Sequence, residues 1–257
     1  MTLNDAKAQI SVVIPVWNEK EKNIKSFYSS LTGVLTELAQ AYQIVFIDDG
    51  STNGVFDILY GLYQKDKRVT IVKLAKNFGQ APALLAGFEY AKGDVIVTMD
   101  VDFQYSPKEL PKLIEKIDRN NTLVSGYRMV RRDSFFRRVS SFMMNKIMNV
   151  RTGIKMRDWG CSFVAVRREL VGQLKIVGRN ARFIKPILAK SAESFAEVEV
   201  RHYSRKDSKS KYNFLRLAKM GIDFLLFYSS RPSKGNVPLF IIEKVVGGLQ
   251  ISSCIRH

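Results

Sequence analysis

The sequence contains few residues of the kinds that build disulfides, zinc sites and histidine-based catalysis. Its 257 residues include two cysteines, Cys161 and Cys254, and two histidines. Two cysteines make neither a disulfide framework nor a zinc site, so we expect a reducing compartment. Residues 1–9 lack the apolar core of a signal peptide, and no uninterrupted apolar run reaches the ~18 residues of a membrane span. We therefore expect a protein that is made and kept on the cytoplasmic side.

The chain is rich in positive charge, which is concentrated in its second half. Residues 1–127 contain 14 Lys and Arg against 15 Asp and Glu, whereas residues 128–257 contain 27 against 9. With 46% hydrophobic residues, the chain can bury the core of one large domain, with or without an appendage. A strongly basic half indicates an anionic partner. Nucleic acid, anionic lipid and a phosphorylated acceptor are the candidates.

The first half alternates apolar strands with amphipathic helices. We expect strands at about 10–16, 43–47, 69–74, 93–99 and 122–127. We expect helices at about 17–42, 54–65, 77–92 and 107–119. This alternation is typical of crossover connections, and it predicts an α/β fold with a mostly parallel sheet.

Polar motifs directly follow four of these strands. They are Pro15–Glu19, Asp48–Ser51, Asn77–Gln80 and Asp100–Gln104. The carboxyl ends of parallel strands meet at one edge of a sheet, so we expect the four motifs to converge there. Asp100 and Asp102 lie two residues apart, share a side of an extended chain, and suit a hard divalent cation that bridges phosphate oxygens. The alternative is that one of them caps the next helix, the other is solvated, and Asp49 is an ordinary N-cap.

The second half combines basic residues with apolar stripes. Residues 134–150 are expected to form a helix that is either a core helix or a helix lying in a membrane interface. Strands are expected at 163–166 and 197–202, with a helix beginning at Arg167. Residues 201–211 form a basic segment, which is either a solvated charge run or a loop that binds a phosphate. The amphipathic helix expected at 212–228 favours a phosphate that is attached to an apolar carrier.

Together these motifs resemble a known family. Ser11–Glu19, Asp48–Thr52, Asn77–Gln80 and Asp100–Gln104 resemble family 2 glycosyltransferases of the GT-A fold. In the second half Arg131–Arg137, Asp158–Cys161 and Ser210–Tyr212 are similar to the polyprenyl-phosphate glycosyltransferases of that family. The resemblance covers about residues 10–232. It implies a GT-A, Rossmann-like, mostly parallel sheet flanked by helices, with C-terminal amphipathic interfacial helices.

The resemblance also implies a domain organisation. Residues 1–211 would form the catalytic domain, with a nucleotide-sugar half at 1–127 and a basic acceptor half at 128–211. Residues 212–257 would contain a membrane-associated helix and a tail that departs from the family. Relatives continue after the equivalent of Pro232 into two membrane-spanning helices, whereas here Glu243 and Lys244 interrupt the segment. Whether this tail is native, truncated or frameshifted stays open, and attachment would rest on the helices at 134–150 and 212–228 or on oligomerisation.

Roles for individual residues follow from the same resemblance. The residues implied for the nucleoside, which we expect to be uridine, are Pro15, Trp17, Glu19 and Asp49. Asp100 would bind ribose or diphosphate, and Asp102 would ligate Mg²⁺ or Mn²⁺. The residues implied for the acceptor phosphate are Arg128, Arg137 and Ser141, with Arg205 and Lys211 on a mobile loop. Asp158 matches an acidic residue near the sugar and is grouped with Asp100 and Asp102 as catalytic, without an assigned chemical step.

The implied reaction agrees with the scarcity of histidine. A phosphate monoester has a second pKa near ~6, so at neutral pH the acceptor is already a dianionic nucleophile and needs no general base. We therefore expect an inverting transfer of a UDP-linked sugar to a polyprenyl phosphate, such as undecaprenyl phosphate, at the cytoplasmic face of an anionic membrane, for building the cell envelope or modifying lipid A. On this interpretation nucleic acid is not a partner.

Two alternatives stay open at this point. The first is a non-catalytic module whose basic half binds anionic lipid or nucleic acid. The second is a glycosyltransferase with a polysaccharide acceptor, which the absence of the Gln-x-x-Arg-Trp sequence of processive relatives disfavours.

Overall fold

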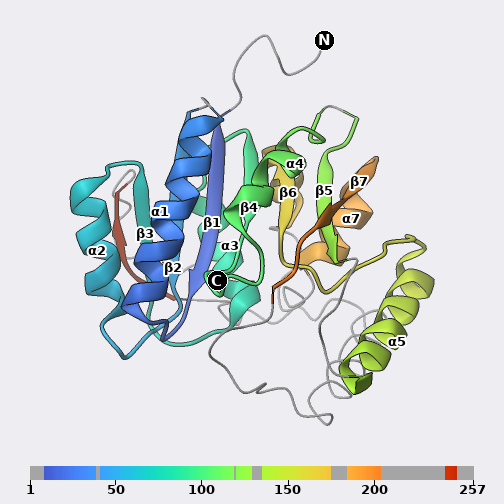
Figure 1. The fold of residues 1–257 in the computed structure, drawn as a ribbon, viewed down its shortest axis with the longest axis horizontal. Coiled ribbons are helices and arrows are strands. Elements are labelled where there is room, and N and C mark those ends of the chain that lie inside the picture. Colours follow the sequence, from blue (N-terminus) through green and yellow to red (C-terminus); the bar gives the residue numbers. More distant parts are fainter. Residues whose placement is uncertain are drawn as a thin grey trace.

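The protein folds around a single mixed sheet (Figure 1). The computed structural model describes residues 9–38, 41–118, 120–128, 135–174, 184–203 and 241–247. The strands are β1 (Ile10–Val16), β2 (Tyr42–Asp48), β3 (Val69–Leu74), β4 (Val95–Thr98), β5 (Leu123–Arg128), β6 (Val164–Arg167), β7 (Phe195–Val200) and β8 (Ile242–Val246). Their order across the sheet is β7-β5-β6-β4-β1-β2-β3-β8.

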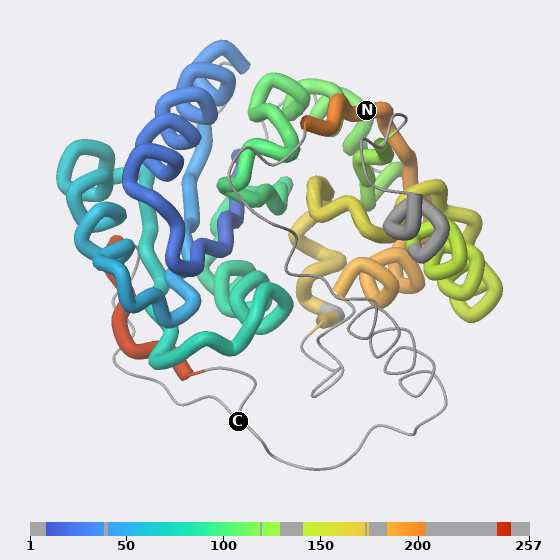
Figure 2. Tube along the Cα trace, turned by 60° about the horizontal axis from the view of Figure 1, so that its bottom comes forward, coloured from blue at the N-terminus to red at the C-terminus, as the bar shows by residue number. Residues whose placement is uncertain are grey.

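Strand direction determines where the loops gather. β4, β1, β2 and β3 are parallel neighbours, while β6 lies antiparallel to both β4 and β5, and β7 is parallel to β5. Six of the described strands therefore end at one side of the sheet, which we call the carboxyl edge. The antiparallel strands β6 and β8 begin there. β1 runs from top to bottom in Figure 1, and Figure 2 turns the lower side, the carboxyl edge, toward the viewer.

Helices cover both faces of the sheet. They are α1 (Glu21–Glu37), α2 (Val55–Lys65), α3 (Gln80–Tyr90), the 3₁₀ helix η2 (Pro107–Glu109), α4 (Leu110–Ile114), α5 (Phe135–Thr152), α6 (Arg168–Gln173) and α7 (Ile184–Ser191). One core layer packs α1, α2 and α4 against the sheet, and the opposite layer contains α3, α6, α7 and part of α5.

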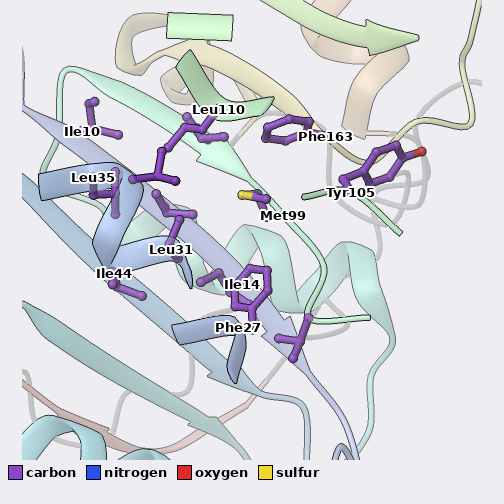
Figure 3. Packing of buried hydrophobic residues seen from close by; sticks show 14 of the residues in the cluster. Ile10, Ile14, Phe27, Leu31, Leu35, Ile44, Met99, Tyr105, Leu110 and Phe163 are labelled. Atoms are coloured by element: carbon purple, nitrogen blue, oxygen red, sulfur yellow. The ribbon is translucent and has the colours of Figure 1, made fainter. Parts of the chain in front are cut away.

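The first core layer follows from the spacing of apolar residues in α1. Phe27, Leu31 and Leu35 recur at intervals of four, so they share one face of the helix, and all three are buried. They pack on the face of β1 that carries Ile10 and Ile14 (Figure 3). Residues alternate between the two faces of a strand, so the intervening Val13 belongs to the opposite layer.

A glycine allows α3 to pack closely against the other face. A Cβ atom at Gly87 would lie 2.4 Å from Cγ1 of Val13 and 2.6 Å from Cδ1 of Ile47. A side chain at this position would force the helix away from the sheet. Because α3 begins at the carboxyl edge, this close packing also fixes the position of its first residue, Gln80.

The structure confirms an α/β fold with a mostly parallel sheet, and it adds a strand that the sequence did not predict. β8 joins the edge of the sheet beside β3, although Glu243 and Lys244 interrupt its apolar pattern. An edge strand bonds to one neighbour only, so it tolerates exposed charges, and Lys73 of β3 pairs with Glu243 at 2.7 Å. Residues 241–247, expected with the tail, thus join the sheet of the predicted catalytic domain.

Two expected helices differ from the prediction. The first begins at Glu21 rather than Trp17, and the segment expected to be helical over 107–119 is a short 3₁₀ helix followed by α4, which ends at Ile114. The amphipathic helix expected at 212–228 lies outside the described residues. In the part of the chain that the structure describes, no helix is both long and apolar enough to cross a membrane.

Candidate active site

The loop after β4 brings its two aspartates to the carboxyl edge. Oδ1 of Asp100 accepts a hydrogen bond from Nε2 of Gln80 at 2.9 Å, and Oδ2 accepts one from Oγ of Ser162 at 2.6 Å. Oδ1 of Asp102 accepts the backbone N–H of Gln104 at 3.0 Å. The next residue, Phe103, has a positive φ of 56°, which is unusual for a bulky side chain. Its ring packs edge-on against Phe27 of α1, which holds this tight turn in place.

The loops after β1 and β2 are tied to each other. The backbone N–H of Asn18 donates to Oγ of Ser51, and Oδ1 of Asn18 accepts the backbone N–H of Thr52, both at 2.9 Å. Asn18 has a φ of 48°, a left-handed conformation that asparagine tolerates. The neighbouring Trp17 side chain is 50% exposed at the edge. Oε1 of Glu19 accepts a hydrogen bond from Nδ2 of Asn23. The indole and the carboxylate expected to contact the nucleoside thus share one braced loop.

Asp49 connects this loop pair to the loop after β3. Its side chain is buried, and its two oxygens accept the backbone N–H groups of Phe78 at 2.8 Å and Gly79 at 2.9 Å. Burial raises the pKa of Asp49, although these two hydrogen bonds act in the opposite direction. The sequence-based alternative of an N-cap on its own helix is not what the structure contains, because the N-cap residue of α2 is Gly54.

A buried ion pair lies further along the same edge. Nε and Nη2 of Arg128, at the end of β5, donate to Oδ2 and Oδ1 of Asp158 at 2.7 and 2.9 Å. The side chains of Arg128 and Asp158 are 14% and 1% exposed. The carboxylate also accepts the backbone N–H of Gly160 at 3.1 Å. Burial acts to lower the pKa of Arg128, but the hydrogen bonds and charge of Asp158 help to raise it overall, so the guanidinium stays charged. Two residues that the sequence assigned to separate roles therefore form one unit.

The segment 157–162 joins this ion pair to the acidic loop. Nζ of Lys185 donates to the backbone oxygens of Asp158 at 2.7 Å and Cys161 at 3.1 Å. Ser162, at the other end of the segment, donates to Asp100. The ring centroids of Tyr105 and Phe163 lie 5.9 Å apart in a stacked arrangement. Figure 3 shows these two side chains next to each other. The acidic loop and the arginine are therefore linked through residues 157–162 at the carboxyl edge.

Helix α5 is held against the same segment by two asparagines. Asn145 accepts the backbone N–H of Trp159 at 3.2 Å and donates to the backbone oxygen of Arg157 at 2.9 Å. Oδ1 of Asn149 accepts the indole N–H of Trp159 at 2.6 Å. α5 carries Ser141, which is half-buried. The predicted acceptor residue Ser141 thus lies on a helix that packs beside Asp158.

The structure shows where most of the predicted site residues lie. Those that it brings to the carboxyl edge are Pro15, Trp17, Glu19, Asp49, Asp100, Asp102, Arg128 and Asp158. Arg205 and Lys211 lie outside the described residues, as does the side chain of Arg137. Sequence reasoning missed Gln80, Ser162 and Lys185 as members of the site. Gln80 lay in a motif without an assigned role, and no local pattern marks Ser162 or Lys185.

The donor set at this edge fits a divalent cation that is bound together with phosphate. Carboxylate oxygens such as those of Asp102 are hard ligands, and Mg²⁺ or Mn²⁺ beside a nucleotide typically uses one or two carboxylates plus phosphate and water. Among the described residues no group of three or more His, Cys, Asp or Glu side chains forms a cage of its own. The residues present therefore suit an ion shared with a diphosphate.

Two bacterial transferases are similar to this chain over most of its length. The chain is 36% identical over 242 residues to the undecaprenyl-phosphate 4-deoxy-4-formamido-L-arabinose transferase of Aeromonas hydrophila subsp. hydrophila, an alignment that covers 93% of this chain and 73% of that protein. It is 34% identical over 234 residues to the enzyme of the same name from Yersinia pestis strain Pestoides F, covering 90% and 71%.

Solved structures share the fold. Glucosyl-3-phosphoglycerate synthase from Mycobacterium tuberculosis, in complex with Mn²⁺, UDP and glucosyl-3-phosphoglycerate, matches with a TM-score of 0.64 at 19% identity, covering 90% of this chain and 83% of that one. The mannosyltransferase PcManGT from Pyrobaculum calidifontis, in complex with GDP-mannose and Mn²⁺, matches with a TM-score of 0.54 at 19% identity, covering 80% and 59%. These likenesses confirm the predicted GT-A type of sheet.

The family assignment rests on the motifs at the carboxyl edge and on these matches. The profile of glycosyl transferase family 2 matches residues 11–174, which include the acidic loop, Arg128 and Asp158. The chain is therefore a glycosyltransferase that belongs to glycosyl transferase family 2.

Proposed function

We propose that the protein is an inverting glycosyltransferase that moves a sugar from a UDP-linked donor to undecaprenyl phosphate at the cytoplasmic face of a membrane. The observation that carries the proposal is the continuity of the carboxyl edge. An acidic loop suited to a nucleotide diphosphate and an arginine suited to a phosphate are joined by residues 158–162. The names of the relatives at 36% and 34% identity support the choice of acceptor.

On the donor side, the proposal assigns the loops after β1, β2 and β4 to the nucleotide. Trp17 offers an exposed aromatic face for a base, and Asp100 offers acceptor oxygens for ribose hydroxyls or the diphosphate. Asp49 would contribute by holding the loop at Phe78 and Gly79 beside the nucleoside. Asp102 would hold Mg²⁺ or Mn²⁺, which when bound supplies positive charge against the departing diphosphate.

On the acceptor side, Arg128 binds the lipid phosphate. An arginine carries five N–H donors in a planar fork, and the pair with Asp158 uses two of them. The remaining donors can bind phosphate oxygens, while Asp158 fixes the plane of the guanidinium. An ionised phosphate oxygen then forms a bond to the anomeric carbon of the sugar. The bond from that carbon to the nucleoside diphosphate breaks, and its electron pair leaves with the diphosphate.

Helix α5 supplies the contact with the membrane in this proposal. Phe142, Met143 and Val150 are 69%, 58% and 76% exposed, and Lys146 lies between them on the helix surface. Large exposed apolar side chains interleaved with a cation suit an anionic lipid interface. Asn145 and Asn149 of the same helix are held to the 157–159 segment, so this docking would bring the lipid phosphate toward Arg128.

The decisive test incubates the protein with labelled UDP-sugars, undecaprenyl phosphate and Mg²⁺. We expect label in the organic phase with one donor, and no such label with Asp102→Asn. Mn²⁺ binding in the presence of UDP, measured by calorimetry, should weaken in the same variant. Asp57→Asn, an exposed aspartate on α2, is the matched control and should behave as wild type. Absence of lipid-linked label with every donor would contradict the proposal.

The membrane contact has its own test. Phe142→Glu should lower the fraction of protein that sediments with phosphatidylglycerol vesicles. The new carboxylate is repelled by the anionic lipid and would have to lose its hydration at the interface. Tyr60→Glu on α2, where the aromatic side chain is 39% exposed, is the control. Equal sedimentation of the two variants would remove α5 from the proposal.

A further inference from the structure

We infer that Gln80 and Ser162 are positioning residues that hold the carboxylate of Asp100 in the orientation required for binding the nucleotide donor. The inference rests on the proposed function and assigns a role to the Asn77–Gln80 motif, which that function does not otherwise use. Each oxygen of Asp100 receives a hydrogen bond from one of the two residues.

The hydroxyl of Ser162 is itself fixed by the sheet. Ser162 lies two residues before β6, and its backbone oxygen accepts a 2.6 Å hydrogen bond from Oγ1 of Thr98, the last residue of β4. Thr98 pairs with Val164 across the two strands. The hydroxyl that donates to Asp100 is therefore held beside the end of β4 and the start of β6, and Asp100 itself follows β4 by two residues.

Gln80 is positioned by an independent set of contacts. It is the first residue of α3, and the preceding residues, Phe78 and Gly79, donate their backbone N–H groups to Asp49. Gly79 has a φ of 95°, a conformation that only glycine adopts readily. Through this turn, the buried carboxylate of Asp49 sets the place from which the amide of Gln80 reaches Asp100.

Both donors are neutral, which matters for the role of Asp100. A lysine or arginine at either position would compensate the negative charge of Asp100. It would also compete with the nucleotide sugar or its metal ion for that carboxylate. An amide and a hydroxyl instead restrict rotation of the carboxylate without contributing a positive charge of their own. We call Gln80, Ser162 and the carboxylate of Asp100 that they hold the clamp. It joins three segments of the carboxyl edge, namely the start of α3, the end of β4 and the segment that carries Asp158.

The test measures binding of UDP with Mn²⁺ by calorimetry, together with steady-state kinetics. Ser162→Ala removes a hydrogen bond to a charged group, so we expect UDP affinity to fall and the donor KM to rise by roughly tenfold. The acceptor KM should stay close to wild type. Ser162→Thr keeps a hydroxyl and should restore most of the loss.

Gln80→Glu provides a second arm that does not depend on a semi-buried site. It replaces the amide donor with a carboxylate of nearly the same size facing Asp100, and we expect a larger loss of UDP affinity than in Ser162→Ala. Gln80 is exposed, so this variant should fold even if Ser162→Ala does not. The controls are Gln64→Glu on α2 and Ser29→Ala on α1, which make the same chemical changes at exposed helix positions.

The outcomes separate the two claims. If the wild-type protein binds no UDP with Mn²⁺, the proposed function fails and this inference fails with it. If the wild type binds UDP but Ser162→Ala and Gln80→Glu bind it as well as their controls do, the proposed function stands and the clamp is wrong. Loss of affinity in both variants, with rescue by Ser162→Thr, supports the clamp.

Discussion

The ion pair between Arg128 and Asp158 gives the sharpest prediction about stability. Its carboxylate is 1% exposed and accepts two hydrogen bonds from the guanidinium. Removing one partner of a buried pair leaves the other charge desolvated without compensation, which costs about 3–5 kcal/mol. Asp158→Ala should therefore lower the free energy of unfolding by about that amount. In a chain of this size, each kcal/mol shifts the melting temperature by roughly 2–4 °C.

A double-mutant cycle isolates the pair from the loss of each side chain alone. The variants are Arg128→Met, Asp158→Ala and the combination, each followed by urea unfolding. We expect the double variant to be less damaged than the sum of the single variants, because neither charge is then left buried alone. The same cycle on Lys25 and Glu21, an exposed pair on α1, should give a coupling of only ~0.3–0.5 kcal/mol. Equal coupling energies in the two cycles would refute the argument.

A separate substitution at Arg128 gives a functional prediction. Arg128→Lys keeps a positive charge but loses the planar fork that binds two oxygens at once. We expect the KM for undecaprenyl phosphate to rise in this variant, while binding of UDP with Mn²⁺ changes little. A change confined to UDP binding would move Arg128 from the acceptor side to the donor side.

Two further predictions concern the last residue of β2 and the loop that follows it. Burial raises the pKa of Asp48, whose Oδ2 has no hydrogen-bond partner among the described residues. The stability associated with this carboxyl is fully present below its unfolded-state pKa of ~4 and is lost as the pH rises through the raised folded-state value. Asp48→Asn should therefore raise the melting temperature at pH 7 more than at pH 4, and an equal effect at both pH values would contradict this. Gly50→Ala should destabilise the protein more than Gly54→Ala, as judged by urea unfolding. Both glycines have positive φ, but only at Gly50 would the new Cβ meet backbone, 2.2 Å from the carbonyl carbon of Lys76. Equal losses in the two variants would mean that the loops do not approach so closely.

The main layers of the fold could be predicted because their signals are local. Strand 69–74 was predicted at its observed bounds, since an apolar run flanked by turn residues is visible without tertiary context. β8 was missed because an edge strand buries little of its surface, and Glu243 and Lys244 break its apolar pattern. Its pairing with β3 also joins residues about 170 positions apart along the chain, as the contact of Lys73 with Glu243 illustrates.

The site was predicted in its parts rather than in its connections. Asp100, Arg128 and Asp158 were each identified by resemblance, but the pairing of Arg128 with Asp158 depends on how β5 and the segment before β6 come together. Gln80 and Ser162 lie 20 and 62 residues from Asp100, so only the folded sheet brings them to one carboxylate. Motif reasoning finds groups that carry chemistry, whereas neutral residues that orient those groups become visible only in three dimensions.

Product analysis tests the central claim most directly. If the lipid phosphate attacks the anomeric carbon, the bond between sugar and diphosphate breaks, and mass spectrometry should detect an undecaprenyl lipid with one phosphate and one sugar, released in equal amount with UDP. A lipid that carries two phosphates, formed together with UMP, would mean attack on phosphorus instead. That result would contradict the account of how Arg128 and the acidic loop act together.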